Sequence, residues 1–205
     1  NFTYTASKEN PQPPNDFDTT VYPNLKGDFK NGFTITFNEL IDSFESFMDY
    51  VPQIYMDCNR RLLTVDPEAK GKAYIQDDGT YGEFYENKYD SHIELLINPH
   101  ADYTKVFDNI EFKSEIRIDD VDQPTETLSS LQFYNDYQDT GVIPLVIGTN
   151  IQQRMRTWRS RIPRHNGTKA RMRDSHIRLI LKFENDNNKR LVLHDITTHF
   201  RVANM

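Results

Sequence analysis

The stretch KVFDNIEFKSEIRI, residues 105–118, decides the fold because apolar and charged side chains alternate along its second half. Phe112, Ile116 and Ile118 fall on one face of an extended chain, and the residues at the positions between are charged or polar. Successive side chains of a strand point to opposite faces, so this pattern buries one face and leaves the other in water. The stretch therefore predicts a long strand with one face against a core.

Other segments share this strand character. Phe33–Phe37 alternates in the same way, and Ser91–Asn98 is a further apolar-rich run. Ser175–Phe183 and Arg190–Val202 are predicted to pair as a hairpin through the polar loop 184–189. Residues 39–49 also fit a short helix, but no long helical pattern occurs. Many short strands between turn residues indicate a mainly β chain, an antiparallel β-sandwich or jelly-roll-like domain.

The start of the chain has a different composition. Prolines at positions 11, 13, 14 and 23 argue against a regular ladder or helix, so residues 1–24 are predicted to be an extended arm or linker and residues 25–205 the β-sandwich domain. The opening NFTYTASKENPQPPND lacks the features of a leader peptide, and we expect either a fragment of a longer polypeptide or a chain whose beginning is disordered. No apolar run approaches the roughly 20 residues of a membrane span.

Charge is distributed unevenly along the chain. Residues 151–178 hold eight arginines and one lysine against a single acid, Asp174, although the whole chain carries a net charge of −7. Arginine pairs bidentately with carboxylates and stacks on aromatic rings, which suits it to interfaces. In an acidic protein we expect the opposing acidic surface to belong to a second copy of the same chain.

The basic segment is therefore the candidate interface. Its apolar residues at 151, 155, 158 and 162 fit a helix, but the neighbouring strands favour a strand ending at Pro163. The acids opposite it are expected within residues 119–126 or 136–139 of a neighbour. Binding of nucleic acid by this segment is disfavoured, because the chain as a whole is acidic. The predicted interface residues are Arg154, Arg156, Trp158, Arg159, Arg161, Arg171 and Arg173.

Motifs for catalysis and metal binding are missing from the sequence. It contains no phosphate-binding loop, serine elbow or HExxH pattern, so we predict no catalytic residue, no cofactor and no metal site. His194 and His199 are expected on opposite faces of a strand. Acid pairs such as Asp16 and Asp18 resemble solvated turns more than calcium loops, as do those at 77–78 and 119–122.

An aromatic cluster suggests a second kind of surface. Aromatic rings stack on sugars, so the cluster could bind carbohydrate or a host receptor, but packing of a tyrosine-rich turn on a sheet is the favoured interpretation. The residues of this cluster are Tyr81, Phe84, Tyr85 and Tyr89.

Several stretches together resemble a known family. FESFMDYVPQIYMDCNRRLLTV (44–65), GKAYIQDDGTYGEFYENKYDSHIELLIN (71–98), TKVFDNIEF (104–112), QQRMRTWRSRIPR (152–164) and the region 171–202 are similar to the C-terminal part of the muzzle or stabilisation proteins of crAss-like bacteriophages. The resemblance extends from about Gly32 to Val202. It departs from the family pattern at Phe44, where a tryptophan is usual, and at His176, where an aromatic residue is usual.

The resemblance implies a structural and non-enzymatic role. The family's members lie at the distal end of a short phage tail, so it implies a virion protein whose partners are copies of itself in a ring and other tail proteins. The alternative from another class is a β-sandwich module that binds carbohydrate or a host receptor.

Overall fold

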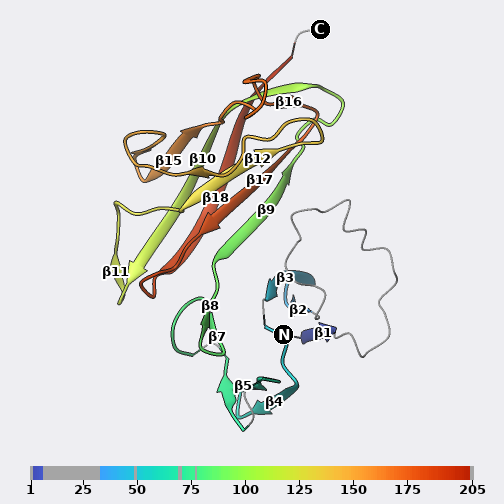
Figure 1. The fold of residues 1–205 in the computed structure, drawn as a ribbon, viewed down its shortest axis with the longest axis vertical. Helices are drawn as coiled ribbons and strands as arrows, with labels where there is room; N and C mark the ends of the chain where they lie inside the picture. Colours follow the sequence, from blue (N-terminus) through green and yellow to red (C-terminus); the bar gives the residue numbers. More distant parts are fainter. Residues whose placement is uncertain (1, 7–32, 49, 69–70, 77, 204–205) are drawn as a thin grey trace. The chain divides into compact units, whose positions relative to one another are not determined.

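Two compact units make up the chain in the computed structural model, Asn1–Tyr89 (unit 1) and Asp90–Met205 (unit 2). The structure describes residues 2–6, 33–48, 50–68, 71–76 and 78–203 (Figure 1). The predicted boundary between an arm and a domain, at residues 24 and 25, lies outside the described residues. The division at Tyr89 was not visible as a change in sequence composition.

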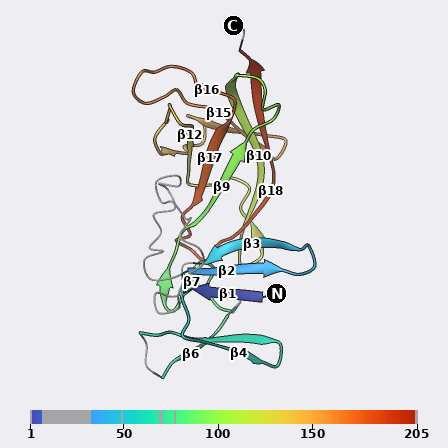
Figure 2. The same ribbon diagram turned by 90° about the vertical axis from the view of Figure 1, so that its right-hand side faces the viewer.

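Unit 2 is built from two antiparallel sheets, as the alternation predicts. One sheet has the order β11-β10-β15-β14, and β10 also pairs with β18 and β16. The other has the order β13-β12-β17-β9. The long strands run lengthwise through the unit (Figures 1 and 2). The strands are β9 (Ser91–Ile97), β10 (Lys105–Ile118), β11 (Val121–Asp122), β12 (Ser130–Tyr134), β13 (Ile143–Pro144), β14 (Ile151–Arg154), β15 (Thr157–Arg161), β16 (Arg173–Asp174), β17 (Ile177–Phe183) and β18 (Arg190–Val202).

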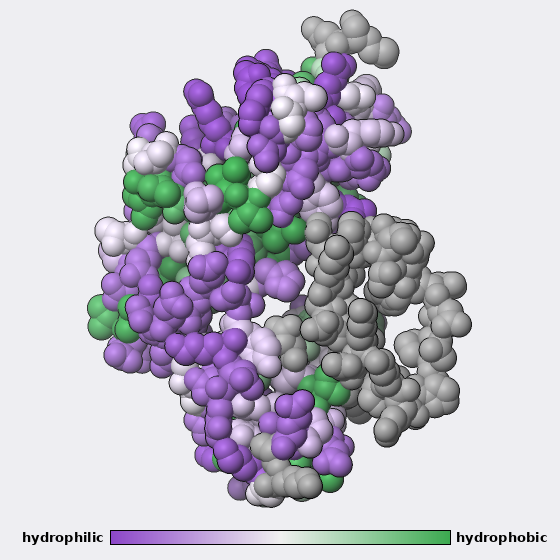
Figure 3. All heavy atoms as spheres, viewed as in Figure 1, coloured by the Kyte–Doolittle hydropathy of each residue, from purple (hydrophilic) through white to green (hydrophobic). Residues whose placement is uncertain are grey.

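A single core lies between these sheets. Phe112 and Trp158 enter it from the first sheet, and Phe133 and Leu179 enter it from the second. Buried and half-buried residues alternate along the whole of β17. The antiparallel β-sandwich predicted from the sequence is thus confirmed. Hydrophilic side chains cover most of unit 2 on the face drawn in Figure 3.

Strand β10 is the central element of the first sheet. One of its edges pairs with β18 along nearly its whole length, from Lys105 to Arg117. Its other edge pairs in turn with β16, β15 and β11. Two irregularities interrupt the β10–β18 ladder, one at Asp108 and one at His194. Such bulges reverse the alternation of side chains beyond them and redirect the inserted residue.

The bulge at His194 corrects one prediction. Strict alternation would place His194 and His199 on opposite faces of β18. Because the bulge inserts one residue, both side chains instead meet carboxylates on the outward face of β10. His194 Nε2 lies 3.4 Å from Glu115, and His199 Nε2 lies 3.1 Å from Glu111.

The predicted hairpin between 175–183 and 190–202 is also wrong. Both segments are strands, but β17 pairs with β12 and β9 whereas β18 pairs with β10 in the opposite sheet. The loop 184–189 crosses from one sheet to the other. Asn185 closes this loop, since its side chain accepts from Lys189 N at 2.8 Å and donates to Lys189 O at 2.8 Å. Each strand can then present an apolar face to the shared core.

Unit 1 consists of three small antiparallel sheets. Residues 43–48 form a strand, so the short helix considered for 39–49 is not present. Phe2–Ala6, at the start of the predicted arm, form a strand paired with Phe33–Asn38, and the prolines that argued against a ladder all lie beyond this strand. The strands are β1 (Phe2–Ala6), β2 (Phe33–Asn38), β3 (Ser43–Met48), β4 (Ile54–Cys58), β5 (Arg61–Val65), β6 (Ala73–Ile75), β7 (Glu83–Phe84) and β8 (Asn87–Lys88).

Membrane insertion through a helix has no support in the described residues. None of them forms a helix that is long and apolar enough to span a bilayer.

Candidate functional site: an arginine pocket

The first part of the basic segment, residues 151–161, folds as a hairpin of β14 and β15. The prediction of a strand over a helix is confirmed here. The chain does not continue as one strand, however, but turns back at Met155 and Arg156, whose φ angles are 51° and 62°. Two consecutive positive φ values are typical of the tight type I′ turn, which usually contains Asn or Gly. The absence of those residues explains why the sequence indicated one continuous strand.

This turn decides which predicted interface residues reach solvent. Trp158 lies opposite Phe112 of β10 and is 1% exposed, so it belongs to the core and not to an interface. This corrects the prediction for Trp158. Arg154, Arg156 and Arg161 are exposed, and no carboxylate of the described chain lies within ion-pair distance of them. Arg173 is likewise exposed on β16 and lacks an ion pair in the described part.

Arg159 already has an acidic partner within its own chain. It stands opposite Glu111 on β10, and its Nε donates to Glu111 Oε1 at 2.6 Å, with a second contact from its Nη2. The hydrogen bond from Arg159 holds the pKa of the Glu111 carboxyl below its usual value, and His199 adds to this effect. Charge repulsion within the basic segment is thus relieved at Arg159 without a neighbouring copy.

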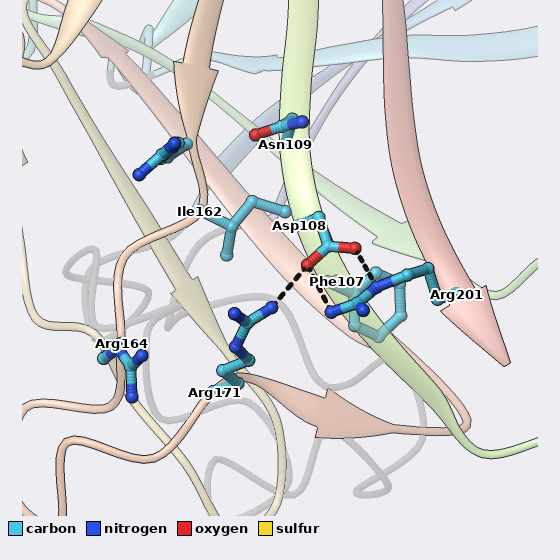
Figure 4. Close-up of a pocket in the computed structure, with 8 residues that line it drawn as sticks. Phe107, Asp108, Asn109, Ile162, Arg164, Arg171 and Arg201 are labelled. Atoms are coloured by element: carbon cyan, nitrogen blue, oxygen red, sulfur yellow. Dashed lines mark hydrogen bonds and ion pairs between the residues drawn. The ribbon is translucent and has the colours of Figure 1, made fainter. Parts of the chain in front are cut away.

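Asp108 organises the other intramolecular pairs. It occupies the bulge between Phe107 and Asn109, and its carboxylate lies between two guanidinium groups. Arg171 Nη1 donates to Oδ1 at 3.0 Å, while Arg201 donates from Nε to Oδ2 at 2.6 Å and from Nη2 to Oδ1 at 3.0 Å. Figure 4 shows both side chains converging on Asp108. Hydrogen bonding to Asp108 also raises the pKa of Arg201.

These residues line an open pocket in unit 2. Its volume is about 410 Å³. Four arginines and one aspartate give the lining an excess of three positive charges. Arg161 and Arg164 stand without a carboxylate among the described residues, and Arg164 donates only to the Lys169 carbonyl, at 3.1 Å. The pocket is lined by Phe107, Asp108, Asn109, Arg161, Ile162, Arg164, Arg171 and Arg201.

Backbone hydrogen bonds hold the walls of the pocket in place. Ile162 N donates to Asp108 O at 2.9 Å, and Phe107 N donates to Met172 O at 3.1 Å. The side chain of Gln138 joins the same wall, donating to Arg171 O at 3.0 Å and accepting from Arg173 N at 2.7 Å. The guanidinium groups are therefore carried on fixed backbone, which reduces the entropy lost when an anion binds.

The sequence did not single out three of the five charged members of this pocket. Asp108, Arg164 and Arg201 are absent from the predicted interface set, although Arg161 and Arg171 belong to it. One signal for Asp108 was available: Phe107 and Ile110 are both buried yet three residues apart, which regular alternation forbids. That break marks the bulge.

The predicted ligand surface in unit 1 is mainly a packed cluster. Phe84 lies 4.7 Å from Tyr50 between ring centroids and 5.9 Å from Tyr89, and Tyr50 is buried. Tyr85 packs on Tyr50, and its hydroxyl donates to Thr64 Oγ1 at 2.8 Å. Of the four predicted residues, Tyr81 is the most exposed. This arrangement favours the packing role over an open platform for sugars.

Metal ligands do not gather in the described residues, where no group of three or more His, Cys, Asp or Glu is placed to hold an ion. Asp119 and Asp120 form the turn between β10 and β11, and Asp122 pairs with Arg117 at 2.8 Å. Asp16, Asp18 and Asp77 lie outside the described residues.

Comparison with known proteins bears on the class of the chain. Residues 79–165 match the family model of the Crassvirus muzzle protein C-terminal domain. The resemblance to crAss muzzle proteins is confirmed. The chain is also 27% identical to the muzzle protein of Bacteroides phage crAss001 over 173 residues, which cover 81% of the chain and 12% of that protein. Both similarities indicate a structural protein of a phage virion.

Proposed function

We propose that this chain is a non-catalytic subunit of the muzzle assembly at the distal end of a short phage tail. The similarity to a muzzle protein over most of the chain carries this proposal. The chain spans 12% of the length of that relative, so its role in the complete assembly belongs to the proposal. Its partners are copies of itself arranged in a ring and other tail proteins.

Exposed arginines of the basic segment supply contacts between subunits. Arg154 and Arg156 sit at the tip of the β14–β15 hairpin, where both are exposed and have no acidic partner among the described residues. A projecting tip with two uncompensated charges suits a carboxylate-bearing surface on another subunit. The whole chain has a net charge of −7, so a second copy offers carboxylates for such a contact.

Particle composition tests the proposed location. Mass spectrometry of purified phage particles should find peptides of this chain at a constant ratio to the other tail proteins. Absence from particles whose tails are complete would contradict the proposal.

A charge-reversal experiment tests the arginine contacts. Phage particles are assembled from equal amounts of wild-type chain and a tagged variant carrying Arg154→Glu and Arg156→Glu. The variant should be under-represented in the particles, because two ion pairs are lost together. Both arginines are changed at once since each exposed pair contributes only about 0–1 kcal/mol. The control carries Arg60→Glu and Arg61→Glu, which make the same change of charge at exposed positions of unit 1.

Two results would redirect this interpretation. Equal incorporation of the hairpin variant and the control would remove these arginines from the interface. Normal incorporation with loss of a salt-sensitive affinity for DNA would assign the hairpin tip to nucleic acid instead.

A further inference from the structure

The two ends of β10 carry opposite and uncompensated charges. The arginine pocket lies near its beginning, where Asp108 forms a bulge. Beyond its last residue, Ile118, the chain turns through Asp119 and Asp120 into β11. We propose that the arginine pocket of one copy receives the Asp119–Asp120 turn of a second copy. This inference rests on the proposed function, because it assumes that copies of the chain meet in the assembly.

The pocket has the chemistry of a site for paired carboxylates. Arg171 and Arg201 are each oriented by Asp108, yet their side chains remain 54% and 62% exposed. Arg161 and Arg164 add two further guanidinium groups to the lining, without acids of their own in the described chain. Guanidinium groups fixed in this way bind carboxylates through parallel hydrogen bonds. The volume of about 410 Å³ is sufficient for two adjacent aspartate side chains.

The Asp119–Asp120 turn has a matching shape. Its φ angles of 49° and 62° are those of a type I′ turn, which makes a narrow tip on the β10–β11 hairpin. Both aspartates are exposed, and neither forms an ion pair with another described residue. Asp122 is already engaged by Arg117, so the free carboxylates of this hairpin are concentrated at its tip.

Geometry requires the two partners to come from different copies. Asp108 and Asp119 are separated by most of the length of β10, roughly 35 Å at about 3.4 Å per residue. The tip of one chain therefore cannot enter its own pocket. A contact between unlike surfaces is heterologous, and repetition with a suitable rotation closes a ring. One such contact, repeated between identical subunits, would account for both the arginine pocket and the exposed Asp119–Asp120 turn.

An acidic protein partner explains the pocket better than nucleic acid does. Asp108 lies in the pocket wall, where it would repel closely spaced phosphates, and the whole chain has a net charge of −7. Two carboxylates on a tight turn can instead approach Arg161 and Arg164, which do not pair with Asp108.

Two variants of the full chain separate the two halves of the contact. The pocket variant carries Arg161→Glu and Arg164→Glu. The tip variant carries Asp119→Asn and Asp120→Asn, which removes both charges while asparagine still tolerates positive φ. Trp158 fluorescence verifies that each variant is folded. Arg60→Glu with Arg61→Glu again serves as the control for net charge.

Sedimentation analysis at low ionic strength measures the association. The wild-type chain should associate with increasing concentration, and each variant alone should show a dissociation constant raised by about tenfold or more. An equimolar mixture of the two variants should form a dimer but no larger species, because one intact pocket meets one intact tip. The control should associate like the wild type.

Each remaining outcome overturns the inference. These outcomes are a wild-type chain that stays monomeric, a tip variant that associates normally, or a mixture that does not recover the dimer. Loss of a salt-dependent DNA affinity in the pocket variant, with association unchanged, would instead make the pocket a phosphate site. Presence in the virion is measured on particles by mass spectrometry, not by association in solution. A failure of this contact would therefore not contradict the proposed location of the chain.

Discussion

Unit 1 and unit 2 contain similar strands but stabilise them differently. Among the residues whose burial the structure describes, only Tyr50 and Pro52 are buried apolar side chains in unit 1, whereas unit 2 has many of them. Unit 2 has one continuous core shared by two sheets. Unit 1 has small sheets joined by ring contacts around Tyr50 and by the buried hydroxyls of Thr34 and Thr64.

Pairing of antiparallel strands alone therefore does not make a unit stable. Small units bury too little apolar surface to offset the entropy of ordering the chain. We therefore expect the free energy of unfolding of unit 2 to depend on its own core. We expect that of unit 1 to depend on a few aromatic contacts instead of a core. Substitutions in the two units can test this contrast.

Truncation in the core of unit 2 should have the largest effect. Leu179 is fully buried, and Leu179→Ala should lower the free energy of unfolding by roughly 2–5 kcal/mol. The matched change in unit 1, Ile54→Ala, removes a side chain that is 50% exposed and should change it by about 0.5 kcal/mol or less. Urea titration followed by fluorescence of Trp158, the single tryptophan, measures the first change, and amide hydrogen exchange in β4–β6 measures the second. Equal losses for the two variants would contradict the contrast.

Loss of the central ring of unit 1 should have an intermediate and local effect. Tyr50→Ala removes the ring on which Phe84 and Tyr85 pack, and should destabilise unit 1 by about 1–3 kcal/mol. Amide hydrogen exchange should accelerate in β4–β6, while the Trp158 unfolding transition should stay in place. Tyr50→Phe, which keeps the ring, is the control. A matching shift of the Trp158 transition would show that the units unfold together.

The ion pair on the outer face of β10 should have the smallest effect, and one that depends on pH. The pKa of Glu111 is lowered in the folded chain, so its contribution is present above its unfolded pKa of about 4.3 and disappears as the pH falls through the lower folded value. The difference in urea midpoint between wild type and Glu111→Gln should therefore be larger at pH 7 than at pH 3. A difference that grows on acidification would reverse the assigned sign.

Regular alternation made the fold predictable from sequence. Residues 105–118 and 177–183 show a clear apolar period, and both are strands whose buried faces meet in the core. The pairing of β17 with β12 and β9 was not predictable in the same way. A short polar loop can join strands within one sheet or across two, and the local sequence of both strands is compatible with either.

The candidate site was predicted only in part, because it depends on irregular backbone. The arginine-rich composition located the basic side of the pocket. The turn at Met155 and Arg156 and the bulge at Asp108 decided which residues face outward, and neither contains the glycine that usually marks such geometry. Arg201 lies far along the sequence from the basic segment and reaches the pocket through the pairing of β18 with β10.

The full-length pairing of β18 with β10 also determines how unit 2 responds to tension. Ser91 pairs with Phe183 at one end of the sandwich, whereas Val202 pairs with Lys105 at the other, so the two ends of unit 2 leave it at opposite ends of the strands. A pulling force between these ends runs along β18, and antiparallel hydrogen bonds lie across the strand direction. The force therefore shears the ladder from Lys105 to Arg117 as a whole instead of opening it one bond at a time. Many hydrogen bonds of unit 2 therefore bear such a load together.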